Sequence, residues 1–353
     1  MRAATSASPT APAATATVPS AAARPRPALV QARLDRLLPL PYFHVVFTLP
    51  QALAEPALQN QRLLYGLLFR AAAGALRSVA DNPQHLGARI GFFAVLHTWC
   101  QALLHHPHLH CVVPVGGPDP HQDRWVPARR LRNGAPFFLP VRVLGARFRR
   151  LFLEAPIELF REGRLEFHTP LQGLSEPRAF RRGLRDWAVR NWVVYAQAPP
   201  AGPAQVAEYL GRYTHRVAIS NHRLLAIDGA AVSFSCKDYR RDGRVQTLRL
   251  QAGEFLRRFL LHVLPRGFVR IRYFGFLANR RGESGIEQAR RLLDVTPAQP
   301  LLPVPPARPE TLTRRLFPAG PDLCPVCRRG HMIRAELLPV PVRSPPGTPD
   351  SRN

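Results

Sequence analysis

A histidine-rich stretch directly before an apolar run constrains this chain more than any other feature. Residues 105–117 read HHPHLHCVVPVGG, and four of the thirteen histidines of the chain lie within the first six of these residues. The apolar run predicts a strand over residues 108–115, which ends at the glycine pair. Side chains alternate between the faces of a strand, so His108 and His110 should share one face, with Leu109 on the other. Two imidazoles at that spacing can bind a metal ion, although a half-buried strand with two hydrogen-bonded histidines fits the same letters.

The charge balance indicates a polyanionic partner. The 353-residue chain has 49 Lys and Arg residues against 23 Asp and Glu residues, a formal net charge of +26, and Lys237 is its single lysine. Arginine suits bidentate phosphate contacts. Codon bias could explain the choice of arginine, but it does not explain the shortage of acidic residues. Nucleic acid is favoured over a membrane, because no stretch of membrane-spanning length is free of charges.

The cysteines and the N-terminus indicate a reducing compartment. The five cysteines are few and odd in number, which is not typical of a disulfide scaffold: Cys100, Cys111, Cys236, Cys324 and Cys327. The N-terminus shows no continuous apolar segment of the kind that a secretory signal needs. We therefore expect a cytoplasmic protein.

Composition divides the chain into three expected parts. Residues 1–33 are rich in Ala, Pro and Thr, and too few large apolar groups are present to offset the entropy of ordering, so a disordered tail is expected. Residues 34–281 form the expected ordered domain. Residues 282–353 read as a Pro-rich linker and tail, interrupted by the short sequence CPVC at residues 324–327.

Within the expected domain, hydrophobic periodicity predicts a mixture of strands and helices. Strands are predicted over residues 42–49, 89–99, 108–115, 164–168, 192–196 and 268–276, and helices over residues 56–80, 141–154, 176–190, 204–216 and 253–264. Asp-Gly pairs at residues 228–229 and 242–243 lie between β-prone runs and predict two hairpins.

A second feature is the tyrosine pair in the predicted helix over residues 204–216. Tyr209 and Tyr213 are four residues apart, so on a helix they lie on one face, with Cβ atoms roughly 6 Å apart. A phenol that attacks a phosphate forms a phosphotyrosine linkage and splits a difficult step in two. The same tyrosines also fit an ordinary apolar helix stripe with Val206, Leu210 and Val217, and spacing alone favours that reading.

Taken together, the two features resemble a known superfamily. The order His108-Leu109-His110 followed by Tyr209-x-x-x-Tyr213 resembles the two-tyrosine branch of the HUH endonucleases. The surrounding segments VVFTLP, HTW, HHPHLHCVVPVGG, EYLGRYTHRVAISNHRL and RRFLLHVLPRGFVRIRYFGFLANR are similar to those of transposases of rolling-circle insertion sequences. The resemblance covers about residues 37–281.

The resemblance implies a fold and a metal site. The fold is of the α+β class: a ferredoxin-like or RRM-like antiparallel sheet carries the histidines, and helices pack behind it. His108 and His110 would bind Mg²⁺ or Mn²⁺, which polarises the scissile phosphate. The third ligand would be His97, with Gln101 as the alternative. His105 and His106 are expected in the turn before the strand, where they could touch DNA.

The resemblance also implies the reaction. Either tyrosine, Tyr209 or Tyr213, would attack single-stranded DNA and leave a 5′-phosphotyrosine and a free 3′-OH, and the other would serve the second cleavage or the strand transfer. The expected DNA contacts are cationic residues beside the tyrosines and on the strand predicted over residues 268–276: Arg212, His215, Arg216, Arg270 and Arg272.

Two departures from the family keep alternatives open. Such transposases usually carry a Cys-rich, zinc-binding segment ahead of the catalytic domain, whereas here no cysteine precedes Cys100. A truncated, non-catalytic and basic DNA-binding remnant is therefore the alternative. Cys324 and Cys327, even with His331, supply at most three of the usual four zinc ligands. A zinc hydrolase built on residues 105–110 is disfavoured, because no HExxH-like general base accompanies the histidines.

Overall fold

The computed structural model of the protein describes residues 37–134, 136–197, 218–238, 243–278 and 284–294. Both predicted tails lie almost wholly outside these ranges, as do the predicted helix over residues 204–216 and the CPVC sequence. The described part belongs to one compact unit, residues 25–306.

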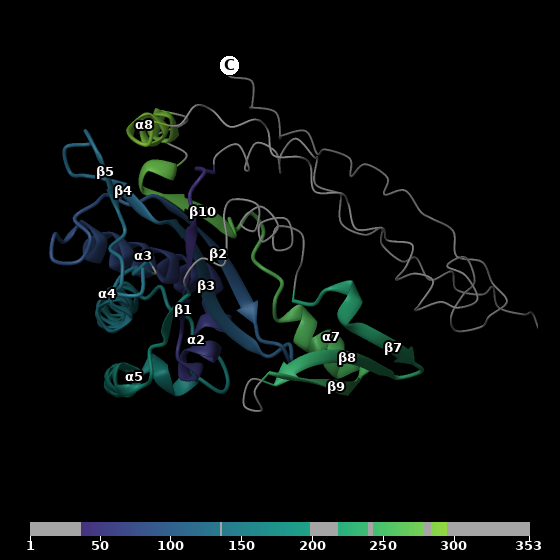
Figure 1. The fold of residues 1–353 in the computed structure, drawn as a ribbon. Coiled ribbons are helices and arrows are strands. Elements are labelled where there is room, and N and C mark those ends of the chain that lie inside the picture. The colour runs from purple at the N-terminus through teal and green to yellow at the C-terminus, as the bar shows by residue number, and fades with distance from the viewer. Residues whose placement is uncertain (1–36, 135, 198–217, 239–242, 279–283, 295–353) are drawn as a thin grey trace, which may run out of the picture. The chain divides into compact units, whose positions relative to one another are not determined.

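The centre of this unit is a five-stranded antiparallel sheet in the order β10-β2-β3-β1-β6 (Figure 1). Its strands are β1 (Tyr42–Thr48), β2 (Phe92–Trp99), β3 (His105–Pro114), β6 (Val194–Gln197) and β10 (Ile271–Phe274). Each neighbouring pair is antiparallel. The expected α+β fold with an antiparallel sheet is therefore confirmed, and the histidine-bearing strand β3 lies at the middle of the sheet.

Helices cover one face of this sheet and form the main core with it. They are α2 (Ala54–Gln59), α3 (Gln61–Asp81), α4 (Val141–Arg161) and α5 (Pro177–Val189). Alternate strand residues such as Val45, Leu96 and Leu109 face this layer, where they join Leu68 and Phe148 in one buried cluster. By length and composition α3 is apolar enough to cross a membrane, but 72% of its most apolar window is buried inside the protein.

Two helix boundaries differ from the prediction. The helix predicted over residues 56–80 is divided at the buried residue Asn60, which ends α2 and precedes α3. The helix predicted to end at residue 154 continues to Arg161 and includes Pro156. The added turns bury Leu159 in the core, and this burial offsets the cost of a proline inside the helix.

The prediction of a strand over residues 164–168 is wrong. Side chains, and not a neighbouring strand, form the hydrogen bonds of its backbone groups. The Glu166 N–H donates to Asn60 Oδ1 at 2.8 Å, and Asn60 Nδ2 donates to the Glu166 carbonyl at 2.8 Å. In the same way Gln59 bonds both backbone groups of His168, at 2.8 and 3.3 Å. The segment is thus partly buried, and hydrogen bonds to Gln59 and Asn60 hold it in place of pairing with the sheet.

Among the described residues, those that cover the other face of the sheet lie at one end of it. Phe93, Val95 and Val112 pack there against Phe276 and against α8 (Ser284–Leu292). Helix α8 lies beyond residue 281, where the linker was expected to begin, and it contributes Ile286 and Ala289 to this second cluster.

A smaller antiparallel sheet follows β6 in the sequence. It contains β7 (Leu224–Asp228), β8 (Ala231–Asp238) and β9 (Arg244–Gln251), and it is followed by α7 (Ala252–Leu260). Both predicted hairpins are confirmed, since β8 pairs with β7 and with β9. Leu103, from the turn between β2 and β3, inserts into the core of this sheet beside Phe234.

Short elements complete the described chain. They are β4 (Gly116–Pro118), β5 (Trp125–Pro127) and the 3₁₀ helices η1 (Gln51–Leu53), η2 (Gln172–Ser175), η3 (Asn221–Arg223) and η5 (Gly275–Leu277).

Candidate metal centre

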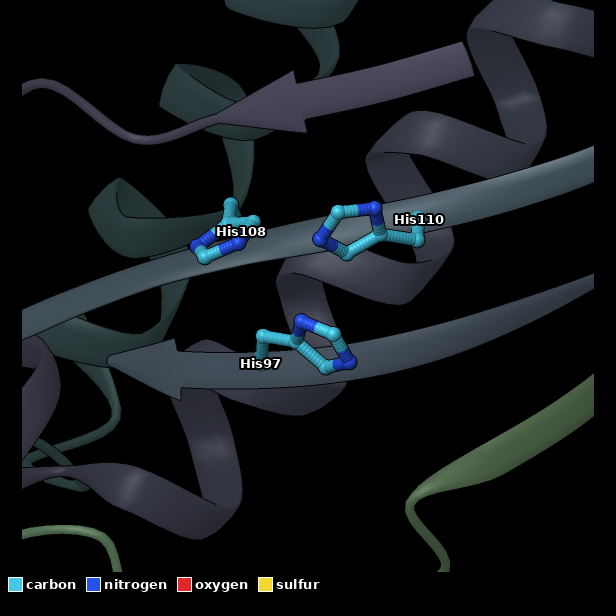
Figure 2. Close-up of side chains that lie close together, drawn as sticks. All are labelled: His97, His108 and His110. Atoms are coloured by element: carbon cyan, nitrogen blue, oxygen red, sulfur yellow. The ribbon is translucent and has the colours of Figure 1, made fainter. Parts of the chain in front are cut away.

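Strands β2 and β3 bring three histidines together on the sheet face opposite the main helix layer. In the antiparallel register His97 lies opposite His108, and Val95 lies opposite His110. Paired and alternate residues share a face, so the three side chains leave the sheet on the same side. Figure 2 shows the rings converging from the two neighbouring strands. The structure thus places His97, the expected third ligand, beside His108 and His110.

The rings are close enough for one ion. A ring nitrogen of each histidine lies within 4.8 Å of those of the other two. The ring centroids are 4.2 Å apart for His97 and His110, 4.8 Å for His108 and His110, and 5.4 Å for His97 and His108. A metal ion with metal–nitrogen distances of about 2.1 Å fits among the three rings after small side-chain rotations.

A backbone hydrogen bond sets the tautomer of His108. Its Nδ1 lies 2.7 Å from the carbonyl oxygen of His106. A carbonyl oxygen only accepts hydrogen bonds, so the proton is on Nδ1 and the lone pair is on Nε2. Outer hydrogen bonds of this kind orient the histidines of metal sites and leave the opposite nitrogen for the ion.

A fourth histidine, His44 of β1, orients His110. Its Nε2 lies 2.7 Å from His110 Nδ1, and the two rings stack with centroids 4.9 Å apart and planes 8° apart. When His110 donates this bond from Nδ1, its Nε2 lone pair is left for a metal. His44 was not among the residues predicted from the sequence. His44 lies within the strand predicted over residues 42–49, but the sequence does not show which strand lies beside it.

Trp99 fixes the third ring. The indole of Trp99 stacks on the His97 imidazole, with centroids 4.6 Å apart and planes 16° apart. His97 is 3% exposed. The ring is therefore held between Trp99 and the other histidines, which reduces the entropy that a metal would have to offset.

The site keeps its histidines neutral. Burial lowers the pKa of His97 and of His110 well below the usual range, and neighbouring histidines lower both pKa values further. Burial also lowers the pKa of His108 to about 4, against a smaller upward effect of its bond to His106. Since only a neutral imidazole binds a metal, the site is ready for binding at neutral pH.

The donor set selects among metals. Three imidazole nitrogens suit transition metals, whereas Mg²⁺ prefers oxygen ligands and keeps several waters. Of the two ions implied by the resemblance, Mn²⁺ fits these side chains better than Mg²⁺.

His105 and His106 belong to the strand and not to the expected turn. Strand β3 begins at His105, and the turn spans the preceding residues. His105 points into the helix layer, where its Nε2 is 2.7 Å from the hydroxyl of Tyr65. His106 Nδ1 lies 3.4 Å from Gln51 Oε1. The strand extends this far because Tyr65 supplies a buried partner for an otherwise costly imidazole.

The remaining predicted residues in the described ranges lie outside the cluster. Gln101 is in the turn after β2, where its carbonyl accepts a hydrogen bond from Arg223. Arg270 borders a hollow beside Trp99 and His262. The guanidinium of Arg272 lies 4.2 Å from the ring centroid of Phe69, on the α3 side of the sheet. Their DNA contacts stay predictions.

The predicted nucleophiles Tyr209 and Tyr213 lie outside the described residues, as do Arg212, His215 and Arg216. Both flanks of their segment adjoin the histidine cluster, however. Gln197 at the end of β6 pairs with His44. Ala218, at the other flank, is buried in a cluster that Trp99 packs against.

Comparison with known proteins gives a consistent result. A family model described as "Putative transposase" matches residues 91–284. The chain is 52% identical over 306 residues to "Putative transposase y4qJ" of Sinorhizobium fredii, covering 87% of this chain and 76% of the relative. It is 33% identical over 248 residues to "Transposase for insertion sequence element IS801" of Pseudomonas savastanoi pv. phaseolicola, covering 70% of this chain and 56% of that relative. No solved structure matches.

Proposed function

The chain belongs to this family of transposases, and we propose that it nicks and rejoins single-stranded DNA through a 5′-phosphotyrosine intermediate. DNA is the partner expected of a transposase, and bacterial cytoplasm is the proposed location. The observation that carries the proposal is the histidine cluster of His97, His108 and His110, because its donor set is that of a metal centre. The two flanks of the tyrosine-bearing segment support it, because both adjoin this cluster.

In the proposed reaction, His97, His108 and His110 would hold a divalent ion, Mn²⁺ or Mg²⁺, which would withdraw charge from the scissile phosphate. His44 and the His106 carbonyl keep two of the ligand rings oriented. The phenol oxygen of Tyr209 or Tyr213 loses its proton and forms a new bond to phosphorus, and the 3′-oxygen leaves and takes up a proton to give the 3′-OH. The phosphotyrosine ester keeps the energy of the broken bond, so the second tyrosine and the free 3′-OH can complete strand transfer.

The test is formation of a covalent adduct. The full chain is incubated with Mn²⁺ and with single-stranded oligonucleotides tiled across the DNA that flanks its gene, and adducts are resolved on denaturing gels. We expect a metal-dependent adduct whose attached peptide contains Tyr209 or Tyr213. Changing both residues, Tyr209→Phe with Tyr213→Phe, should abolish it. Tyr42 of β1 offers a control outside the histidine cluster, because Tyr42→Phe loses only hydrogen bonds to the Leu38 backbone and should leave the adduct intact.

Two outcomes would contradict the proposal. An adduct that persists in the double variant would refute the assigned nucleophiles. Absence of any adduct, together with salt-sensitive binding of many DNA sequences, would favour the non-catalytic DNA-binding remnant.

A further inference from the structure

The edge strand β6 places an exposed aromatic side chain on the sheet face of the histidine cluster. Val46 of β1 pairs with His110 of β3 on one side and with Tyr195 of β6 on the other. The three residues therefore form one row across the sheet, on one face. Neighbouring strands are about 4.8 Å apart, so Tyr195 stands about 10 Å from His110 along this row. Tyr195 is 55% exposed.

A group of arginines borders the same strand. Arg142 and Arg149 of α4, with Arg190 directly after α5, line a hollow of about 470 Å³. Within the described ranges, none of the three forms an ion pair with a carboxylate; Arg149 donates a hydrogen bond to the carbonyl of Ala188 at 3.4 Å. Three arginines around one hollow suit an anionic ligand.

The hollow and the tyrosine are continuous along the chain. Val193 lines the hollow and is 43% exposed. It lies two residues before Tyr195, so in an extended chain both side chains point the same way. Arg142 and Arg149 belong to α4 on the opposite face of the sheet, so a ligand that leaves the histidine cluster across Tyr195 reaches the arginines by passing around the edge strand β6.

We propose that this surface, the β6 track, binds the single-stranded DNA that enters or leaves the metal centre: a base stacks on Tyr195, and the following phosphates bind Arg142, Arg149 and Arg190. The inference rests on the proposed function for its substrate class. A single strand fits and a duplex does not, because stacking on a protein ring requires a base that has left its own helix. Arginines supply the sequence-independent backbone contacts.

The first experiment isolates stacking. Binding of a fluorescein-labelled oligothymidylate is measured by anisotropy in EDTA, so that neither metal nor cleavage contributes. Tyr195→Ala should weaken binding roughly tenfold, within the range for loss of one stacked base. Tyr195→Phe should bind as the unchanged chain does, because it keeps the ring. Binding of a blunt duplex should be insensitive to Tyr195→Ala.

The second experiment isolates phosphate contacts. The triple variant Arg142→Gln, Arg149→Gln and Arg190→Gln should reduce the slope of log affinity against log salt by roughly 2, that is, about 0.7 for each lost contact. A matched control, the exposed residues Arg129, Arg130 and Arg132 changed to Gln, removes the same charge elsewhere and should leave the slope unchanged.

The proposal is overturned if Tyr195→Ala binds the oligothymidylate with unchanged affinity, or if the two triple variants lose the same slope. Neither result depends on the adduct assay, because no reaction occurs in EDTA. If no adduct forms but the β6 track binds DNA as expected, the proposed chemistry is refuted and the proposed DNA path stands. If the adduct forms but the β6 variants bind DNA unchanged, only the proposed DNA path is refuted.

Discussion

At the scale of single residues, the candidate site depends on which nitrogen of each histidine carries the proton. His108 has its tautomer set by the His106 carbonyl, which accepts but cannot donate. His110 is bonded to another imidazole, His44, and either ring could donate. Metal binding at His110 Nε2 selects the arrangement in which His110 donates from Nδ1 and His44 accepts. In the proposed metal centre, His44 would thus be a positioning residue.

This role predicts the effect of changing His44. His44→Leu removes the acceptor, and we expect the affinity for Mn²⁺ to fall 10–100-fold, the usual cost of losing an outer partner of a metal-binding histidine. His44→Gln keeps an acceptor oxygen and should retain most of the affinity. Titration of the metal-free protein with Mn²⁺, followed by electron paramagnetic resonance, measures both.

The matched control for this prediction is Tyr42→Phe. Tyr42 lies on the same strand and face, two residues before His44, and its hydroxyl bonds the backbone of Leu38. Its change costs hydrogen bonds but touches no histidine of the cluster, so the Mn²⁺ affinity should not move. Unchanged affinity in His44→Leu would show that His110 is oriented without His44.

The sequence predicted part of this site and not the rest for a physical reason. His108 and His110 could be found from strand alternation within one short segment, and His97 was the first choice for the third position. His44 could not be found, because its contact depends on which strand lies beside β3 and in which register. The neighbour of a strand and its register depend on packing of the whole core, which the local sequence does not encode.

At the scale of elements, predictions succeeded where a pattern was long and failed where side chains replaced backbone partners. The amphipathic pattern placed α5 within one residue at each end. The segment of residues 164–168 has the letters of a strand, yet Asn60 and Gln59 satisfy its backbone. No periodicity in a sequence distinguishes a strand partner from an amide side chain.

The junction of β10 and η5 gives a prediction at this scale. Gly275 has φ of 62°, and a Cβ atom there would collide with the carbonyl oxygen of Ile90. We expect Gly275→Ala to lower the free energy of unfolding by about 2–3 kcal/mol, because both the strained backbone and the collision must be relieved. Urea denaturation followed by circular dichroism measures the change.

Gly253 in α7 is the matched control for this change. A Cβ atom there would meet no atom within 4 Å. Gly253→Ala should therefore raise the free energy of unfolding, by up to about 1 kcal/mol, since alanine is the better helix former. If Gly275→Ala were equally harmless, the close approach of η5 to residue 90 would be wrong.

At the scale of the whole molecule, the fold class was predictable and the strand order was not. Alternation and hairpin signals identified the β-rich chain with helices between strands, and the resemblance supplied the antiparallel sheet. The order β10-β2-β3-β1-β6 joins segments more than a hundred residues apart, such as β10 and β2. Long-range pairing of that kind is decided by the packed core, which a local pattern does not encode.

Burial of so many histidines makes the whole molecule sensitive to acid. In the described part, burial lowers the pKa of seven histidines: His44, His97, His105, His106, His108, His110 and His262. For His105 and His108 the folded value is about 4, below the ordinary value of 6.5. Between these values the unfolded chain binds more protons than the folded one, so stability rises with pH and is lost as the pH falls from about 6.5 towards 4.

We therefore expect the metal-free protein to lose stability steeply between pH 7 and pH 5. Each such histidine contributes up to about 1.4 kcal/mol per pH unit inside its window. Urea denaturation in EDTA at pH 7, 6 and 5 gives the slope. His105→Gln can keep a bond to Tyr65 without the proton and should flatten the slope. A free energy of unfolding that is equal at pH 7 and pH 5 would show that these imidazoles gain protons in place. In that case the neutral, metal-ready cluster would not be a property of the folded state.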